Sequence, residues 1–496
     1  MNPGDPIFPH PVYARYVLSG GFAESKRLLY PYMMQANDAH VLMLHATGIL
    51  DEQHTVALLR ALQRVKERGP DVFTYHPEVE DLFFLIEGDL IEQAGADAGG
   101  NLQIARSRND LDAVMCHLLV RDRLLDIERL VLDLRRVLID LIRQHIDTVM
   151  PGITHTQPAQ PTTLAHYLLG VLGPLERDSQ RLRAVSVRNN RSSLGAAAFT
   201  TTSFPIDREL TAALLGFDGV IVNGYDAVGG ADHMVEATQV LATMASGLAR
   251  FVNDLLIWAR FEAGILRVHQ SFAQISSIMP QKRNPVVFEH IRARTGYVLG
   301  DANTVLTMVH SAAFGDTVDV EDPIYVPLAR TFDSAEAVVA LLNAALPLAE
   351  INTDVLAARA TVGNSSATAV ADGLVRDYGL PFRTAHEITS KSVRQASARN
   401  EQISLADVIS ASATVLGSPI DLDQAWLSDR LDARVFVAER SVMGGPAPTA
   451  VRAALIAAEQ QLQTDRDAIE IFAQHIAAAV QDRTQRIAAL IGQPAI

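Results

Sequence analysis

The sequence has 496 residues, of which 48% are hydrophobic and only 6% aromatic, a composition typical of alanine- and leucine-rich helices that pack on one another. A net charge of -15 argues against the basic surface that a general nucleic-acid-binding protein needs. The single cysteine, Cys116, excludes an internal disulfide framework and a thiolate-rich metal site. No segment has the roughly 20 uninterrupted apolar residues of a membrane span, and the N-terminal segment lacks the apolar run of a signal peptide, so we expect a cytoplasmic, all-α protein.

The strongest helical pattern runs from Asn109 to Met150, where the sequence contains neither proline nor glycine. Its apolar residues recur at alternating steps of three and four and form one stripe on a helix; they are Leu124, Ile127, Val131, Leu134, Leu138 and Leu141. A helix of about 40 residues is about 60 Å long, which suits an elongated bundle better than a compact globule.

Four more long helical patterns follow, at Pro161–Asn189, Ala227–Ala263, Pro285–Ala313 and Tyr325–Glu350. Together with the first they predict a central bundle of about five helices. The segments before and after this bundle indicate shorter helices separated by turns rich in glycine and proline, and no segment favours an extensive β-sheet. We therefore predict three helical domains, at residues 1–105, 106–356 and 357–496.

Three polar segments interrupt the helical pattern, and each has an ordinary structural explanation. "SRND", with Ser107, Arg108 and Asn109, precedes the long helix and can cap its N-terminus. In "ITHTQPAQP", with Thr154, His155 and Gln157, the histidine can be an ordinary turn residue. "SSIMPQKRNP", with Ser276, Ser277, Met279, Lys282 and Asn284, can be a loop in which Asn284 caps the next helix.

Taken together, the three segments also supply the groups for one kind of reaction. Arg108, Asn109, Thr154, Lys282 and Asn284 are cations and hydrogen-bond donors suited to carboxylates, which indicates a small acidic substrate. His155 can exchange a proton near neutral pH, and Glu289 can orient it. Ser276 can act as a base where backbone amides and a nearby cation stabilise its alkoxide. The inventory predicts a site for proton abstraction with stabilisation of an oxyanion.

The three segments resemble, in order and spacing, the signature regions of the aspartase/fumarase superfamily. "SRND", the "AQP" that follows the histidine and Gln281 between Pro280 and Lys282 are similar to the argininosuccinate lyase branch. "GLPFRTAHE" and "GGPAP" in the last third of the chain resemble the same branch. The resemblance covers the chain from about Glu80 to Gly445.

This resemblance implies a three-domain helical subunit and a homotetramer with a twenty-helix core, in which three subunits build each active site. It implies a reversible elimination that releases fumarate from an N-substituted aspartate. Ser276 is then the base that removes the Cβ proton, Lys282 and Asn284 stabilise the aci-carboxylate, and His155 with Glu289 serves the leaving group. The residues expected to bind substrate are Ser107, Arg108, Asn109, Thr154, Gln157, Asn284, Ser277 and Met279. We expect no metal or other cofactor, because the sequence has no phosphate-binding glycine loop and no metal-ligand spacing.

The sequence departs from argininosuccinate lyases where they bind the arginine part of their substrate. Phe83 stands in place of a histidine in "EDLF", and Gly315, Val320 and Pro323 stand where those enzymes have a tyrosine, a glutamine and a lysine. A polar substrate binds weakly when its hydrogen-bonding partners are lost, so we expect another amine, as in ethylenediamine-disuccinate lyases, and a less polar amine pocket. Two alternatives remain open: a diverged argininosuccinate lyase, and an inactive structural protein like the crystallins of this family.

A further departure lies before the two serines, where the family has glycine and this chain has Ile275. Loss of glycine restricts the backbone, so we expect closure of this loop to differ.

Overall fold

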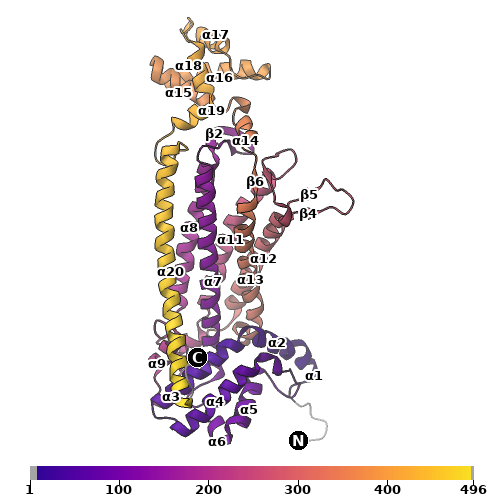
Figure 1. Ribbon diagram of the computed structural model, residues 1–496, viewed down its shortest axis with the longest axis vertical. Coiled ribbons are helices and arrows are strands. Elements are labelled where there is room, and N and C mark those ends of the chain that lie inside the picture. Colours follow the sequence, from indigo (N-terminus) through magenta and orange to yellow (C-terminus); the bar gives the residue numbers. More distant parts are fainter. Residues whose placement is uncertain (1–7, 493–496) are drawn as a thin grey trace.

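The computed structural model describes residues 8–492, so the first residues of the predicted N-terminal domain and part of the segment tested for a signal peptide lie outside it. The chain is 71% helical with 5% strand, which confirms the predicted all-α class. It forms a long central bundle with a group of short helices at each end (Figure 1).

Five helices form the bundle, as the sequence predicts. They are α7 (Arg108–Gln144), α8 (Leu164–Asn189), α11 (Asp232–Trp258), α12 (Val286–Ser311) and α13 (Tyr325–Ala345). Two boundaries differ from the prediction. The first helix ends at Gln144, because the chain turns at residues 145–148 and continues as a strand. The third pattern, Ala227–Ala263, divides into α10 (Gly224–Gly229) and α11, since Gly230 and Ala231 leave the helical conformation.

The predicted apolar stripe of α7 is the centre of the core. Leu124, Ile127, Val131, Leu134 and Leu138 are each at most 1% exposed. Helix α7 packs against α8 and α13, and α11 packs against α8 and α12. Two segments, Asp232–Trp258 and Val318–Leu348, are long and apolar enough to cross a membrane, but both belong to this bundle, where packing against other helices accounts for their apolar character.

Short helices precede the bundle and share its core. They are α1 (Pro11–Tyr13), α2 (Ser19–Leu28), α3 (Tyr30–Ala46), α4 (Glu52–Arg68), α5 (Leu82–Ala94) and α6 (Ala96–Gly99), followed after the bundle begins by α9 (Arg208–Leu215). Helix α3 packs against α4, α7 and α9, and one hydrophobic cluster runs from these helices into the bundle. The N-terminal end of α7 therefore lies among these short helices.

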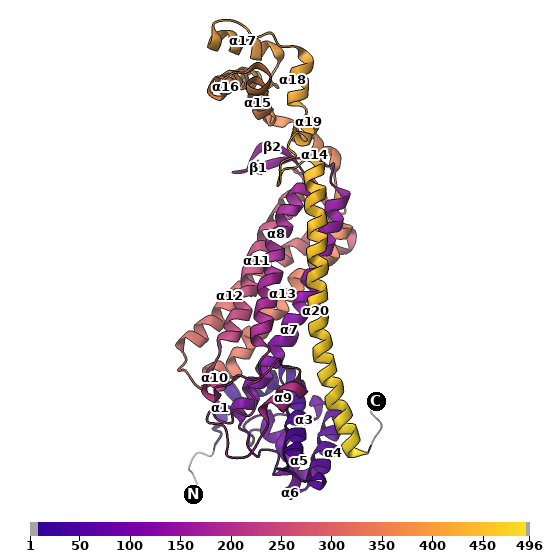
Figure 2. The same cartoon turned by 90° about the vertical axis from the view of Figure 1, so that its left-hand side faces the viewer.

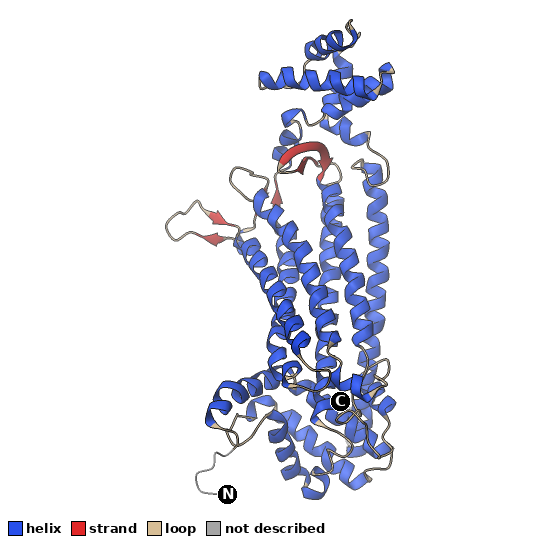
Figure 3. Ribbon diagram, turned by 180° about the vertical axis from the view of Figure 1, so that it is seen from behind, coloured by secondary structure: helices blue, strands red, loops and turns tan. Residues whose placement is uncertain are grey.

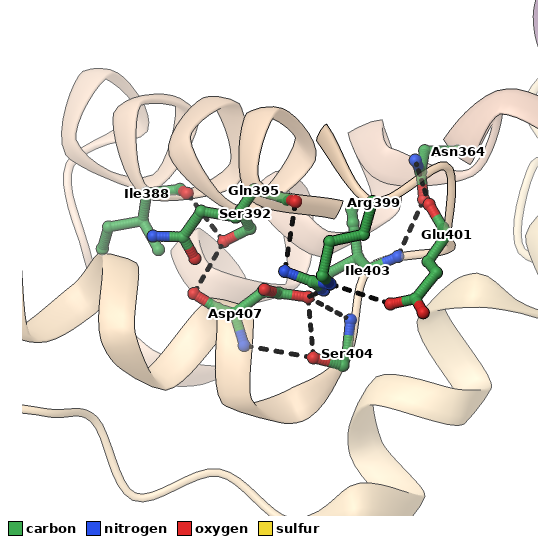
Figure 4. A network of polar contacts seen from close by, with 9 residues as sticks. All are labelled: Asn364, Ile388, Ser392, Gln395, Arg399, Glu401, Ile403, Ser404 and Asp407. Atoms are coloured by element: carbon green, nitrogen blue, oxygen red, sulfur yellow. Dashed lines mark hydrogen bonds and ion pairs between the residues drawn. The ribbon is translucent and has the colours of Figure 1, made fainter. Parts of the chain in front are cut away.

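A second, separate hydrophobic core lies at the opposite end of the bundle. The helices there are α14 (Thr353–Ala360), α15 (Ala367–Tyr378), α16 (Phe382–Ala398), α17 (Leu405–Leu416), α18 (Gln424–Leu431) and α19 (Ala433–Ala438). Figure 4 shows how the turn before α17 is held: Arg399 donates to the Asp407 carboxylate at 2.7 Å, and Asp407 also accepts from the Ser404 hydroxyl at 2.7 Å. The hydrogen bond from Arg399 lowers the pKa of Asp407 to about 2.

The chain ends with α20 (Pro448–Ile491), a helix of 44 residues that returns along the bundle beside α7 and α8 (Figures 1 and 2). The expectation of only short helices after residue 351 is wrong for this segment. Its buried residues, such as Leu455, Leu462 and Phe472, join the core of the bundle. The predicted domain boundaries near residues 105 and 356 stay predictions.

Within residues 8–492, six short strands form three antiparallel pairs, and strands are red in Figure 3. The strands are β1 (Val149–Thr154), β2 (Gln157–Thr163), β3 (Leu266–Arg267), β4 (Gln274–Ile275), β5 (Arg283–Asn284) and β6 (Glu350–Ile351). Strand β1 pairs with β2, β3 with β6, and β4 with β5. Two of these pairs carry the second and third polar segments.

Candidate active site

The first polar segment starts α7, and its capping role is confirmed. Ser107 is the N-cap, and Asp110 completes a capping box. The Ser107 hydroxyl accepts from the backbone N–H of Asp110, and the Asp110 carboxylate accepts from the backbone N–H of Ser107. The Ser107 hydroxyl also donates to Asn109 Oδ1 at 2.7 Å. Arg108 and Asn109 are partly buried on the first turn of the helix and point to groups outside it.

Carboxylates of the same chain hold both of these predicted substrate-binding residues. Arg108 Nη1 donates to Asp81 Oδ2 at 2.7 Å, and its guanidinium lies 5.0 Å from the ring centroid of Phe84. The Asn109 amide donates to the carboxylate of Asp316. A substrate carboxylate that binds Arg108 therefore has to accept from the guanidinium N–H groups that do not bind Asp81.

The loop between α12 and α13 brings more acidic groups to this place. Burial and a hydrogen bond with Asp316 raise the pKa of Glu321 to about 9. Burial, with the nearby carboxylates of Asp322 and Asp81, raises the pKa of Asp112 well above its ordinary value. Sequence reasoning missed Asp316 and Glu321, although "GDTVDVED" is rich in acids, and it expected a less polar pocket here. The loop carries acidic groups in this chain, and the polarity of the amine pocket stays a prediction.

The second polar segment is the tip of the β1–β2 hairpin. Thr154 pairs with Gln157, and His155 and Thr156 form the two-residue turn between them with φ values of 49° and 64°. Non-glycine residues adopt this region only where the surrounding structure imposes it. Gly152 permits the hairpin to close, because a Cβ there would lie 2.7 Å from the Gln160 carbonyl oxygen. The tip, including Thr154, His155 and Gln157, is exposed.

The third polar segment is the loop between β4 and β5, which projects from the side of the bundle (Figures 1 and 3). The Ser276 hydroxyl oxygen accepts hydrogen bonds from the backbone N–H groups of Met279, at 3.1 Å, and Ile278, at 3.4 Å. Two amide donors at this oxygen favour its ionised form. Ser277 and Lys282 are exposed, and the Lys282 ammonium has no hydrogen bond or ion pair to any described residue.

The remaining predicted residues of this segment lie at its end and just after it. Asn284 belongs to β5, where it pairs with Gln274. It does not cap α12: Pro285 holds that position, and no side chain caps the helix. Glu289 is exposed on the first turn of α12 and makes no ion pair with His155 in this chain.

Within one chain the three segments are far apart. Helix α7 has 37 residues, which corresponds to about 55 Å from the Arg108 turn to the end that carries the β1–β2 hairpin. Figure 1 shows the β4–β5 loop on a third side, away from both. No hydrogen bond or ion pair among residues 8–492 joins one segment to another. Among the same residues, no three His, Cys, Asp or Glu side chains are grouped to hold a metal ion.

Comparisons with known proteins decide the family. Residues 24–300 match the family described as "Lyase", and residues 364–438 match "Argininosuccinate lyase C-terminal". The chain belongs to the argininosuccinate lyase-like branch of the aspartase/fumarase superfamily. It is a carbon–nitrogen lyase that releases fumarate. The predicted family and reaction class are confirmed.

Two curated relatives and one solved structure illustrate the relationship. Argininosuccinate lyase 1 of Shouchella clausii is 34% identical over 455 residues, which are 91% of each chain. Argininosuccinate lyase 2 of Agrobacterium fabrum is 34% identical over 98% of this chain and 97% of its own. The crystal structure of EDDS lyase in complex with formate superposes with a TM-score of 0.86, at 31% identity, over 94% of this chain and 93% of that chain.

Proposed function

We propose that this enzyme eliminates an amine from an N-substituted aspartate and leaves fumarate, with Ser276 as the base. The observation that carries the proposal is the pair of backbone amides that donate to the Ser276 hydroxyl oxygen. They stabilise the alkoxide before substrate arrives, so the serine can take the Cβ proton. The charge that then develops on the substrate carboxylate is absent from the ground state, and Lys282 and Asn284 are suited to stabilise it.

The other predicted residues take the remaining roles in this proposal. His155, oriented by Glu289, exchanges the proton on the leaving-group side. Those that hold the substrate carboxylates are Ser107, Arg108, Asn109, Thr154, Gln157, Ser277 and Met279. No described residue of one chain joins these groups, so we propose a cytoplasmic homotetramer with a twenty-helix core, in which each active site takes one segment from each of three subunits.

Exposed apolar side chains on the loop support contact with another subunit. Ile275 is 78% exposed and Ile278 is 83% exposed in the single chain. Both flank Ser276 on a loop that reaches away from its own bundle (Figure 1). A neighbouring subunit covers these side chains in the proposed assembly and places Ser276 near the first and second segments of other chains.

The amine in this proposal carries a positive charge. Asp112, Asp316 and Glu321 lie beside Asn109, and an ammonium group compensates the cost of ionising partly buried carboxylates that are close together. Gly315 supports an amine other than arginine, because its φ of 152° is a conformation that a tyrosine rarely adopts. In this proposal the loop around Gly315 differs from that of the arginine-binding enzymes in backbone conformation as well as in side chains.

The second candidate is argininosuccinate lyase, which the names of the curated relatives favour. One assay separates the two: fumarate formation, followed by its ultraviolet absorbance, from argininosuccinate and from aspartates N-substituted with diamines, monoamines and neutral amines. We expect the diamine compounds to be the best substrates. Efficient turnover of argininosuccinate instead would replace the first proposal with the second, and a preference for neutral amines would remove the role given to the acidic groups.

A further inference from the structure

A cavity of about 470 Å³ lies between α7, α8 and α20, remote from the three polar segments. Glu128 on its wall is 20 positions along α7 from Arg108, which corresponds to about 30 Å. The volume is within the range of about 300–1,000 Å³ that is typical of small-molecule sites. Most of the wall is apolar and includes Val187, Ala468 and Ile469.

One wall of this cavity carries a buried carboxyl group that is only half satisfied. Glu128 is 2% exposed. Its Oε1 accepts a hydrogen bond from the Ser186 hydroxyl, but its Oε2 has no partner among the described residues. Burial raises the pKa of Glu128 to about 7, against the opposing effects of Ser186 and Arg183. A buried polar atom without a partner is uncommon in folded proteins and is a place where a ligand gains affinity.

A second residue of the cavity wall, Arg183, carries a buried donor without a partner. Arg183 lies over the Phe472 ring, 4.6 Å from its centroid, and its Nη1 is buried without a hydrogen-bond partner among the described residues. It makes no ion pair with Glu128 within 4.0 Å. Stacking holds the guanidinium plane in place and does not use its N–H donors.

The other two charged side chains of the cavity wall, Asp465 and Arg188, have partners. Asp465 accepts from Arg135 at 2.5 Å, and Arg188 is held by Glu236, with 2.8 Å between Nε and Oε2. One acid and one cation are therefore left to recognise a ligand. A simple anion satisfies only the arginine, and a simple cation satisfies only the glutamate.

We propose that this cavity binds a free α-amino acid with an apolar side chain, whose carboxylate meets Arg183 and whose ammonium group meets Glu128. The side chain of the amino acid packs against the apolar wall formed by α8 and α20. This ligand pairs both groups at once and buries apolar surface. The site is separate from the elimination reaction, so the proposal does not depend on the identity of the substrate.

Calorimetric titration of the full chain tests the proposal with four compounds: L-leucine, L-phenylalanine, 3-phenylpropionate, which lacks the ammonium group, and 2-phenylethylamine, which lacks the carboxylate. We expect at least one of the amino acids to bind, and both truncated compounds to bind about tenfold or more weakly than phenylalanine, as expected for loss of a charged hydrogen bond. Absence of amino-acid binding at about 10 mM overturns the proposal. Equal or tighter binding of either truncated compound also overturns it.

Three variants then place the ligand in this cavity. Arg183→Met keeps an apolar stem over Phe472, and Glu128→Gln keeps an acceptor for Ser186; each is expected to weaken amino-acid binding about tenfold or more. Arg177→Gln changes an exposed arginine of α8 outside the cavity and is expected to leave affinity unchanged. Unchanged affinity in Arg183→Met means that the amino acid binds elsewhere and overturns the proposal. If Glu128→Gln fails to fold by circular dichroism, Arg183→Met and the truncated compounds decide.

Discussion

The Asp110 carboxylate accepts a hydrogen bond from the backbone N–H of Gly195 at 2.7 Å, across 85 positions of sequence. The same carboxylate accepts from the N–H groups of Ala197, at 3.1 Å, and Ser107, at 2.9 Å. Asp110 is fully buried. It therefore ties the loop after α8 to the first turn of α7, and the acidic residue of "SRND" has a structural role beside residues proposed to bind substrate.

Replacing Asp110 by alanine leaves three backbone donors without an acceptor, one of them buried and two partly buried. We expect Asp110→Ala to lower the free energy of unfolding by about 3 kcal/mol, measured by urea unfolding at a fixed protein concentration. Asp133→Ala is the matched control on the same helix: its carboxylate makes an exposed ion pair with Arg466, and its loss is expected to cost at most about 1 kcal/mol. Equal losses in the two variants would show that the network around Asp110 contributes little.

The proposed sharing of active sites between subunits predicts complementation between two inactive variants. Ser276→Ala and His155→Ala are each expected to release no measurable fumarate alone. When the two chains are co-expressed with different affinity tags and purified through both, random mixing leaves about one quarter of the sites with both residues intact, and activity returns in that proportion.

The control for this experiment is the double variant Ser276→Ala/His155→Ala, co-expressed with itself, which is expected to stay inactive. If the two single variants also stay inactive when mixed, while size-exclusion chromatography shows intact assemblies, both residues act from the same chain and the proposed assembly of the site is wrong.

Gly152 predicts a third effect, on the hairpin that carries His155. A Cβ at this position would lie 2.7 Å from the Gln160 carbonyl oxygen, a backbone atom that cannot move without opening the hairpin. We expect Gly152→Ala to lower the free energy of unfolding by about 1–3 kcal/mol and to lower kcat for fumarate release, because the turn shifts with its strands. Gly170→Ala on α8 is the control: no atom lies within 4 Å of its Cβ, and this change is expected to raise stability by about 0.5–1 kcal/mol. A Gly152→Ala enzyme with wild-type kcat would separate the hairpin from catalysis.

The buried carboxyl group of Glu128 makes stability depend on pH in a defined window. Burial raises its pKa from 4.5 to about 7. Below pH 4.5 the folded and unfolded states both hold the proton; as pH rises from 4.5 to 7 the unfolded state loses it first, so this group destabilises the wild-type fold progressively. Glutamine does not titrate. The stability of Glu128→Gln relative to wild type is therefore expected to rise by about 3 kcal/mol across this window and then stay constant.

Thermal unfolding at a series of pH values measures this difference. Glu470→Gln, at an exposed position of α20, serves as the control, and its difference from wild type is expected to stay the same over the window. A Glu128→Gln difference that does not change with pH would mean that the carboxyl group is solvated.

Sequence patterns predicted the bundle because periodicity on one helix reports burial directly. The stripe at Leu124, Ile127 and Val131 is an example, and each of these residues is fully buried. A long helix could also have been predicted for α20, whose sequence contains no proline or glycine after Pro448. Its alanine-rich, polar sequence instead resembled that of the short helices before it. The β1–β2 hairpin was missed because prolines at 151, 158 and 161 argue against strands, although this exposed two-stranded pair tolerates them.

The candidate site was only partly predictable for a different reason. Motifs identified Ser276, His155 and Arg108 as residue types, but one chain holds them far apart, and they meet only in the proposed assembly. Asp81 and Asp316, which bind Arg108 and Asn109 in this chain, sit at a helix N-cap and in an irregular loop. Contacts made by loop residues follow no regular spacing along the sequence, so the three-dimensional structure is needed to identify them.

The position of α20 also bears on the order in which the protein can be completed during synthesis. The ion pair between Arg135 and Asp465 joins residues 330 positions apart, and α20 is synthesised well after α7 and α8, the helices whose side it covers. Until then this side exposes Arg135, Glu128 and the apolar residues around them to the cell. Apolar surface of α7 and α8 that α20 covers in the folded chain therefore stays exposed until α20 is made, and exposed surface of this kind favours aggregation or chaperone binding.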